Sequence, residues 1–178
     1  MKNQRFFNQQ VCAWQPKLAD FGRGIVIDMC LSLRKVKPAD VDLLYEWAND
    51  SEVRKNAFHT EPIPYENHVK WFAKILEDPS VYQYILYQRE LPIGQIRLNV
   101  EGGEALIDYS ISAEYRGKGF GSKLLQLVRE QIATDKISNV IKLIGQVKYE
   151  NQASARAFEK CGFTKREMTD YLQYEFCL

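Results

Sequence analysis

The sequence lacks the residues that build metal centres and disulfide frameworks. It has two histidines, and its four cysteines include no pair at C-x-x-C spacing. Structural zinc needs several such ligands close together, and disulfide-stabilised domains are short and rich in cysteine. We therefore expect no metal site and no disulfide, and we expect the cysteines to be buried thiols.

An excess of one charge and a long apolar run are also missing. The chain carries 24 lysines and arginines against 23 acidic residues, a net charge of +1. Nucleic acids and anionic membranes are gathered by a basic field, and a membrane helix needs about 18 or more apolar residues in a row. The segment 21–33 contains Arg23 and Asp28 and has no small-residue cleavage site, unlike a signal peptide. We expect a cytoplasmic protein without a nucleic-acid or membrane partner.

The length of 178 residues suits one domain. Residues 1–28 match no recognisable element and are interpreted as an N-terminal extension of unknown role, ahead of a domain at 29–178. Period-two alternation predicts strands at 30–36, 82–88, 93–100, 105–111, 140–147, 164–167 and 171–177. Helical spacing and capping predict helices that begin at Pro38 and near Glu52, and others at 65–76, 118–134 and 151–160. Gly102-Gly103 favours a hairpin. The fold class is mixed α/β (α+β) with an antiparallel meander in the middle.

A glycine-rich run lies between the strand at 105–111 and the helix that follows. Its sequence is Arg116-Gly117-Lys118-Gly119-Phe120-Gly121-Ser122. Alternate glycines allow sharp turns with uncovered amides, and a helix N-terminus adds unpaired N–H groups and positive potential. The run therefore predicts a phosphate-binding loop. The G-x-G-x-G spacing differs from the dinucleotide fingerprint G-x-G-x-x-G, and no Gly-Lys-Ser/Thr ending of a P-loop is present.

Two motifs resemble those of the GNAT N-acetyltransferases. The glycine run is similar to the family's pyrophosphate loop, R/Q-x-x-G-x-G/A. The run Glu150-Asn151-Gln152-Ala153-Ser154-Ala155-Arg156-Ala157-Phe158-Glu159-Lys160-Cys161-Gly162-Phe163 resembles its strand-to-helix segment. The resemblance covers about residues 31–178. It implies a mostly antiparallel sheet of six to seven strands with about four helices, in which the strands at 105–111 and 140–147 splay apart around acetyl-CoA, the cosubstrate.

The resemblance also implies roles for individual residues. The amides of 117–122 would hold the pyrophosphate, with Arg116 and Lys118 near the phosphates. The backbone of Ile111 would bind the pantetheine arm and polarise the thioester carbonyl. Asn151 would bind the pantetheine chain or cap its helix, and both roles are compatible. The cofactor-binding residues expected on this basis are Ile111, Arg116, Gly117, Lys118, Gly119, Phe120, Gly121, Ser122, Asn151, Ser154 and Phe158.

Catalysis requires a neutral amine, so a base must take the proton of a protonated one. Asp108 is the preferred catalytic candidate because the family often carries an acidic residue on this strand; a solvated strand position is the alternative. Weaker candidates are His68, expected at the surface of its helix, Tyr84 and Glu61. Many relatives have a tyrosine at the position of Phe158 that protonates the leaving thiolate, a role that phenylalanine cannot fill. A thiol with a pKa of about 8.5 leaves tolerably as thiolate, so activity need not be lost, and Ser154, Tyr149 or water could substitute.

The acceptor is less constrained. The polar and aromatic segment 47–72 is similar to GNAT domains that acetylate nucleotide-linked amino sugars, as in pseudaminic-acid-type pathways, and more loosely to enzymes that acetylate protein N-termini. We expect transfer of an acetyl group to a primary amine of a small molecule, by a monomer or homodimer. The alternatives are a protein or peptide N-terminal acetyltransferase and a non-catalytic CoA-binding module.

Overall fold

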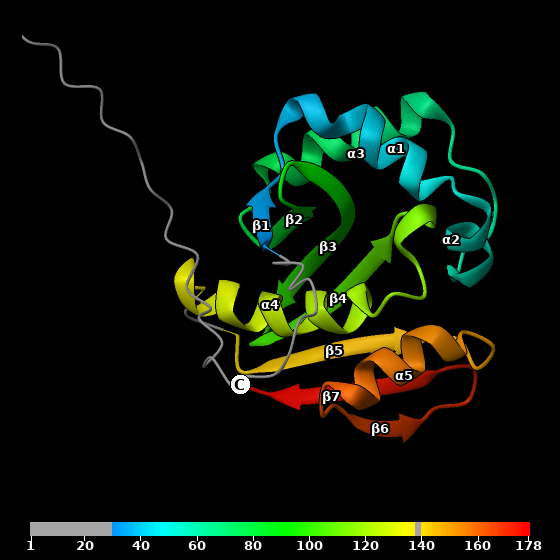
Figure 1. Ribbon diagram of the computed structural model, residues 1–178, viewed down its shortest axis with the longest axis vertical. Coiled ribbons are helices and arrows are strands. Elements are labelled where there is room, and N and C mark those ends of the chain that lie inside the picture. Colours follow the sequence, from blue (N-terminus) through cyan, green and yellow to red (C-terminus); the bar gives the residue numbers. More distant parts are fainter. Residues whose placement is uncertain (1–29, 138–139) are drawn as a thin grey trace, which may run out of the picture.

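The computed structural model describes residues 30–137 and 140–178 (Figure 1). Residues 1–28, including Cys12, lie outside the described part. The elements in chain order are β1 (Leu31–Lys35), α1 (Val41–Ala48), α2 (Ser51–Asn56), α3 (Tyr65–Glu77), β2 (Val81–Gln88), β3 (Leu91–Glu101), β4 (Glu104–Ile111), α4 (Phe120–Thr134), β5 (Lys142–Val147), α5 (Gln152–Lys160), β6 (Thr164–Glu167) and β7 (Leu172–Cys177). Short 3-10 turns occupy Pro38–Asp40 and Ala113–Tyr115.

The seven strands form one sheet in the order β1-β2-β3-β4-β5-β7-β6. All neighbours are antiparallel except β4 and β5, which run parallel because α4 connects them. The hairpin between β3 and β4 turns on Gly102 and Gly103, both at positive φ, a conformation that costs glycine little. The predicted mixed, mostly antiparallel fold with a central meander is confirmed.

One face of the sheet is covered by α4 and α5. Alternate residues of β2, β3 and β4 point to this face, and they pack against a continuous apolar side of α4. Three side chains of α4 are fully buried there: Leu124, Leu125 and Val128. α5 adds Phe158 to the same cluster. This layer is the main core of the protein.

The other face is covered by α1 and α3, which lie together across β2 and β3 (Figure 1). Its apolar cluster is small and centres on Leu44, Phe72 and Ile85. Asp50, between α1 and α2, is the N-cap of α2, since its carboxylate accepts hydrogen bonds from the amides of Glu52 and Val53. This cap starts α2 at Ser51, directly after the turn that ends α1.

Several sequence predictions need correction. α4 begins at Phe120 rather than at residue 118, because Gly117 and Gly119 adopt positive φ and cannot continue a helix. Residues 38–40 form a 3-10 turn before α1 instead of the first turn of an α-helix. Among the described cysteines only Cys161 is buried, whereas Cys177 is exposed.

The described residues contain no helix long and apolar enough to cross a membrane, and no metal-binding group of His, Cys, Asp or Glu.

Candidate functional site

β4 and β5 separate halfway along their length. They pair from Glu104 with Lys142 to Ile107 with Gly145, and the pairing then stops although β4 continues to Ile111. β4 remains paired with β3 up to Ile111, and β5 remains paired with β7 up to its last residue. The two strands visibly diverge toward their carboxyl ends (Figure 1). The last four residues of β4 therefore have no ladder pairing with β5, and we call this separation of the two strands the opening.

The glycine-rich loop lies at the end of this opening. Gly117 has φ 73° and Gly119 has φ 81°, so the chain turns twice before α4. Within the described part of the chain, the amides of residues 117–122 donate no hydrogen bond to the protein, and the first bond of α4 runs from the Lys123 amide to the Gly119 carbonyl at 3.3 Å. Unpaired amides at the start of a 15-residue helix form a site for an anion.

Arg116 is the first residue of the glycine-rich loop, but its side chain is bound to groups outside the loop. Its Nε donates to the Ile111 carbonyl at 2.9 Å, and a terminal nitrogen lies 2.6 Å from Oδ1 of Asp50. Burial opposes ionisation of Asp50, but hydrogen bonds from Arg116 and from the Val53 and Glu52 amides lower its pKa below the usual range. Arg116 thus ties α2 to the end of β4. Lys118 is exposed, with its Nζ 5.2 Å from the centre of the Tyr115 ring.

The start of α5 borders the opening from the other side. Asn151 caps this helix, since its side-chain oxygen accepts from the Ser154 amide at 3.1 Å. The Ser154 hydroxyl lies 3.1 Å from the hydroxyl of Tyr109, which comes from β4. This contact joins β4 to α5 at the level where β4 and β5 have separated.

Phe158 fills the space beneath these groups. Its side chain is buried, stacks on Tyr174 at 5.2 Å between ring centres, and meets Phe163 edge-on at 4.9 Å. A Cβ at Gly145 would lie 2.3 Å from Cζ of Phe158, so the ring requires glycine at the last position of β5 that pairs with β4. Phe158 is thus a buried ring and brings no hydrogen-bond donor to this place.

Asp108 faces the opposite side of the sheet, toward α1 and α3. Its carboxylate accepts from Nε2 of Gln95 at 3.1 Å and lies 3.4 Å from a terminal nitrogen of Arg97. Gln83, one strand further, donates to Gln95 at 3.0 Å. The Asp108 side chain is 55% exposed, whereas Gln83 and Gln95 are buried. An accessible carboxylate is thus held in place by a line of buried amides.

The weaker candidates lie elsewhere. His68, expected at the surface, is only 2% exposed; its Nε2 lies 3.1 Å from the Val41 carbonyl, and burial lowers its pKa. Tyr84 belongs to the α4 face, where burial and a 2.6 Å hydrogen bond to Asp135 raise its pKa. Glu61 is exposed in the loop before α3. The Tyr149 hydroxyl is bound to the Met168 carbonyl.

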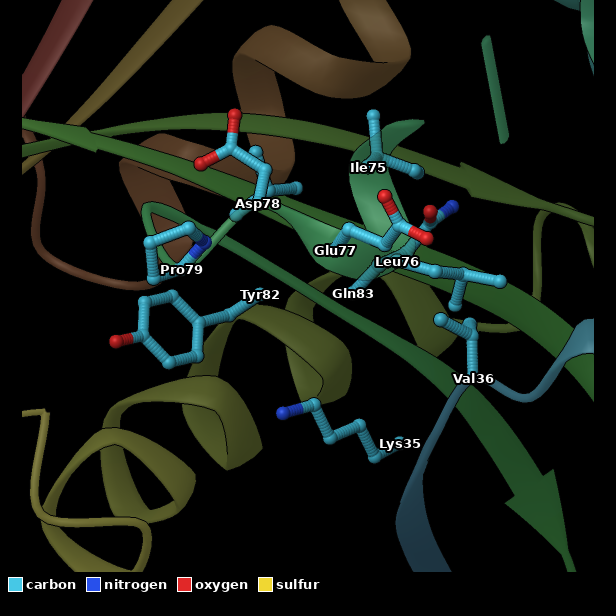
Figure 2. Close-up of a pocket in the computed structure, with 10 residues that line it drawn as sticks. Lys35, Val36, Ile75, Leu76, Glu77, Asp78, Pro79, Tyr82 and Gln83 are labelled. Atoms are coloured by element: carbon cyan, nitrogen blue, oxygen red, sulfur yellow. The ribbon is translucent and has the colours of Figure 1, made fainter. Parts of the chain in front are cut away.

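A surface cavity of about 140 Å³ occurs at a different place, between the end of α3 and the strands β1 and β2 (Figure 2). Its lining includes Lys35, Asp78 and Tyr82, and none of the residues predicted for the acetyl-CoA site. The cavity is therefore separate from the opening between β4 and β5.

Sequence reasoning missed Gln83, Gln95, Arg97, Tyr109 and Asp50 as neighbours of the site. Three of them reach Asp108 or its partners through the register of β2, β3 and β4, in which Asp108 pairs with Arg97. Asp50 is 66 positions from Arg116. Capping predicted a helix start near Glu52, but a local cap does not reveal that Asp50 also binds Arg116.

Comparison with known proteins assigns the class. Residues 31–164 match the family model described as "Acetyltransferase (GNAT) domain". The chain therefore belongs to the GNAT acetyltransferase family and is an acyltransferase, which confirms the predicted family and enzyme class.

The relatives of known sequence are distant. The chain is 26% identical over 144 residues to p20, an uncharacterised N-acetyltransferase of Bacillus licheniformis. The aligned region covers 76% of this chain and 79% of p20. It is also 26% identical over 152 residues to the aminoglycoside N(6')-acetyltransferase type 1 of Klebsiella pneumoniae, covering 76% of this chain and 75% of that protein.

Solved structures share the fold. A spermidine N-acetyltransferase from Vibrio cholerae in complex with CoA and spermine has a TM-score of 0.73 at 20% identity, covering 83% of this chain and 95% of that one. An aminoglycoside acetyltransferase in complex with coenzyme A has a TM-score of 0.70 at 23% identity, covering 83% and 94%. Both solved proteins hold coenzyme A, in keeping with the predicted cosubstrate.

Proposed function

We propose that this protein transfers the acetyl group of acetyl-CoA to a primary amine of a small molecule. The observation that carries the proposal is the row of amides at 117–122, which have no acceptor in the described protein and lie where β4 and β5 separate. A diphosphate supplies the acceptors that these amides lack. The opening between the strands then leads the pantetheine arm from the phosphates toward Asn151.

The cofactor-binding residues are assigned on the same basis. The amides of residues 117–122 bind the pyrophosphate, and the backbone of Ile111 and the side chain of Asn151 bind the pantetheine. Lys118 is exposed at the loop and free to approach the phosphates. Arg116 acts mainly by position in this arrangement, because its guanidinium is already bound to Asp50 and to the Ile111 carbonyl.

Asp108 is proposed as the general base. Its carboxylate lies on the α1–α3 face, is solvent-accessible, and is oriented by Gln95 and Arg97. An alkylamine is mostly protonated near neutral pH and becomes a nucleophile only after losing a proton. A carboxylate beside the opening accepts that proton directly or through one water molecule.

The acceptor is proposed as a small-molecule amine. The named relatives act on spermidine and on aminoglycosides, which are small molecules with primary amines. The narrower expectation of a nucleotide-linked amino sugar gains no support from these relatives. Nucleotide-linked amino sugars are therefore tested as acceptors together with polyamines, aminoglycosides and N-terminal peptides.

A thermal-shift titration tests the cofactor part. Acetyl-CoA at about 100 times its Kd should stabilise the fold by about 2.7 kcal/mol. The matched pair Gly119→Ala and Gly102→Ala separates the loop from general backbone effects: both glycines have positive φ, and a Cβ at either meets nothing within 4 Å. Only Gly119→Ala should reduce the ligand-induced shift. An unchanged melting temperature of the wild-type protein at high acetyl-CoA contradicts the proposal.

Thiol release with the acceptor panel tests the transfer. A signal with small amines and none with N-terminal peptides supports the proposed function, and the reverse result identifies a peptide acetyltransferase. Bound acetyl-CoA with no thiol release from any acceptor points to a CoA-binding module.

A further inference from the structure

The reaction needs a group that stabilises the departing sulfur. Breaking the thioester leaves a thiolate inside the opening, where a nearby hydrogen-bond donor lowers the energy of the developing charge. Phe158 carries no such donor, and its ring is buried against Gly145, Phe163 and Tyr174. The inference that follows rests on the proposed function, since the thioester must lie between β4 and β5.

Tyr109 brings a hydroxyl to this place. It lies on β4 two residues beyond Ile107, the last residue paired with β5. Its ring meets Phe158 edge-on at 5.8 Å between centres. It also lies against the start of α4, because a Cβ at Gly121 would be 3.3 Å from Cε2 of Tyr109 and 3.5 Å from its hydroxyl oxygen. The hydroxyl is therefore positioned between the phosphate loop, α5 and the strand opening.

Ser154 holds this hydroxyl in place. The two oxygens are 3.1 Å apart, and the Ser154 amide is bound to Asn151. Each hydroxyl has one proton to donate, and the contact between them uses one of the two. One O–H of the pair remains available to a third group. The phenol is the more acidic of the two hydroxyls and the stronger donor to an anion.

The alternation of a strand separates Tyr109 from the proposed base. Consecutive residues point to opposite faces of the sheet, so Asp108 faces α1 and α3 while Tyr109 faces α4 and α5. The amine and its base then occupy one side of the opening. The thiol, arriving from the phosphate loop at the start of α4, occupies the other side together with Tyr109.

We propose that Tyr109, positioned by Ser154, donates a hydrogen bond to the departing thiolate and so supplies the group that Phe158 lacks. The amine enters this step neutral, after its ammonium proton has passed through Asp108 to solvent. Its nitrogen then forms a bond to the acetyl carbon and gives its excess proton to the Asp108 carboxylate. The C–S bond breaks, and its electron pair goes to sulfur. The thiolate later takes a proton from solvent, and Asp108 returns its own to solvent.

The proton of Tyr109 stays on its oxygen throughout. Burial raises the pKa of Tyr109 to about 12, whereas a thiol has a pKa of about 8.5. Complete transfer to sulfur would therefore be unfavourable, and a thiolate of this acidity departs without it. Tyr109 acts as a neutral donor, and we expect no loss of rate from its ionisation below about pH 10.

The variants Tyr109→Phe and Ser154→Ala test the assignment as a matched pair. Both remove the hydrogen bond that joins β4 to α5, but only Tyr109→Phe removes the phenol. We expect Tyr109→Phe to lower kcat by about 10- to 100-fold with little change in KM for acetyl-CoA. Ser154→Ala should lower kcat by about threefold or less, since the phenol remains. As a control, the acetyl-CoA-induced thermal shift of each variant should equal that of wild type, as expected if the fold and the cofactor site are intact.

Equal losses of kcat in the two variants would show that the contact only connects the two elements and would overturn the inference, as would a larger loss for Ser154→Ala. A kcat of Tyr109→Phe within twofold of wild type overturns it as well. Failure of the proposed function itself gives a different result, because the wild-type protein would then release no thiol with any small amine, whether or not acetyl-CoA raises its melting temperature. Incorporating a fluorinated tyrosine at position 109 keeps the ring and hydroxyl, and its rate should stay at or above that of wild type.

Discussion

The two faces of the sheet differ in what they bury. Toward α4 and α5 the sheet presents a wide apolar cluster that extends from β2 to β7. Toward α1 and α3 the apolar cluster is small, and beside it Gln83, Gln95 and Arg97 lead in a line to Asp108. Burying amide groups is costly unless they are hydrogen-bonded, and Oε1 of Gln83 has no described partner. One face therefore supplies stability, while the other gives up some of it to orient a carboxylate.

A cavity in the apolar face is the strongest test of whether this face supplies most of the stability. Leu124→Ala removes a side chain that is fully buried under α4. We expect a loss of about 2 to 5 kcal/mol in the free energy of unfolding, measured by urea denaturation. Val69→Ala on α3, whose side chain is 37% exposed, is the control and should cost much less. Similar losses for both would contradict the expectation that burial against the sheet determines the cost.

The polar face should show the opposite behaviour, a loss of activity without a loss of stability. Asp108→Asn keeps the shape of the side chain but removes the carboxylate that we propose as the base, so we expect kcat to fall by about 100-fold or more. The acetyl-CoA-induced thermal shift should remain as in wild type. Glu104→Gln is the control on the same strand, where it removes an exposed ion pair with Lys142. If the pH–rate profile of Asp108→Asn matches that of wild type, Asp108 is not the base.

The smallest expected effect concerns His68, the buried titratable group on the α3 side. Burial lowers its pKa in the folded protein, so between about pH 6.5 and that lower value the unfolded chain binds more protons. The stabilisation from neutral His68 is present above pH 6.5 and is lost as the pH falls through this window. Denaturation between pH 7.5 and 5.5 should show this loss in wild type and not in His68→Gln. Replacing the exposed His59 with glutamine should leave it unchanged.

Much of the fold was predictable because its signals are local. The strands from β2 to β4 follow from alternation and from the Gly102-Gly103 turn, and α5 follows from its capping residue and terminal glycine. The start of α4 was misplaced by two residues, because sequence spacing does not reveal that Gly119 takes a left-handed conformation. His68 was expected at the surface, since a helical pattern alone does not show that Tyr45, Trp71 and Phe72 surround it.

The sequence alone determined the family, the class of reaction and the position of the glycine-rich loop that we propose as the phosphate site, because these depend on short runs of residues whose backbone chemistry is local. Only the tertiary structure decided which groups meet around the opening. The register of β3 and β4 brings Gln95 and Arg97 to Asp108, and the packing of α5 against β4 brings Ser154 to Tyr109. These contacts join residues 11 to 45 positions apart, and no local pattern in the chain encodes such a distance.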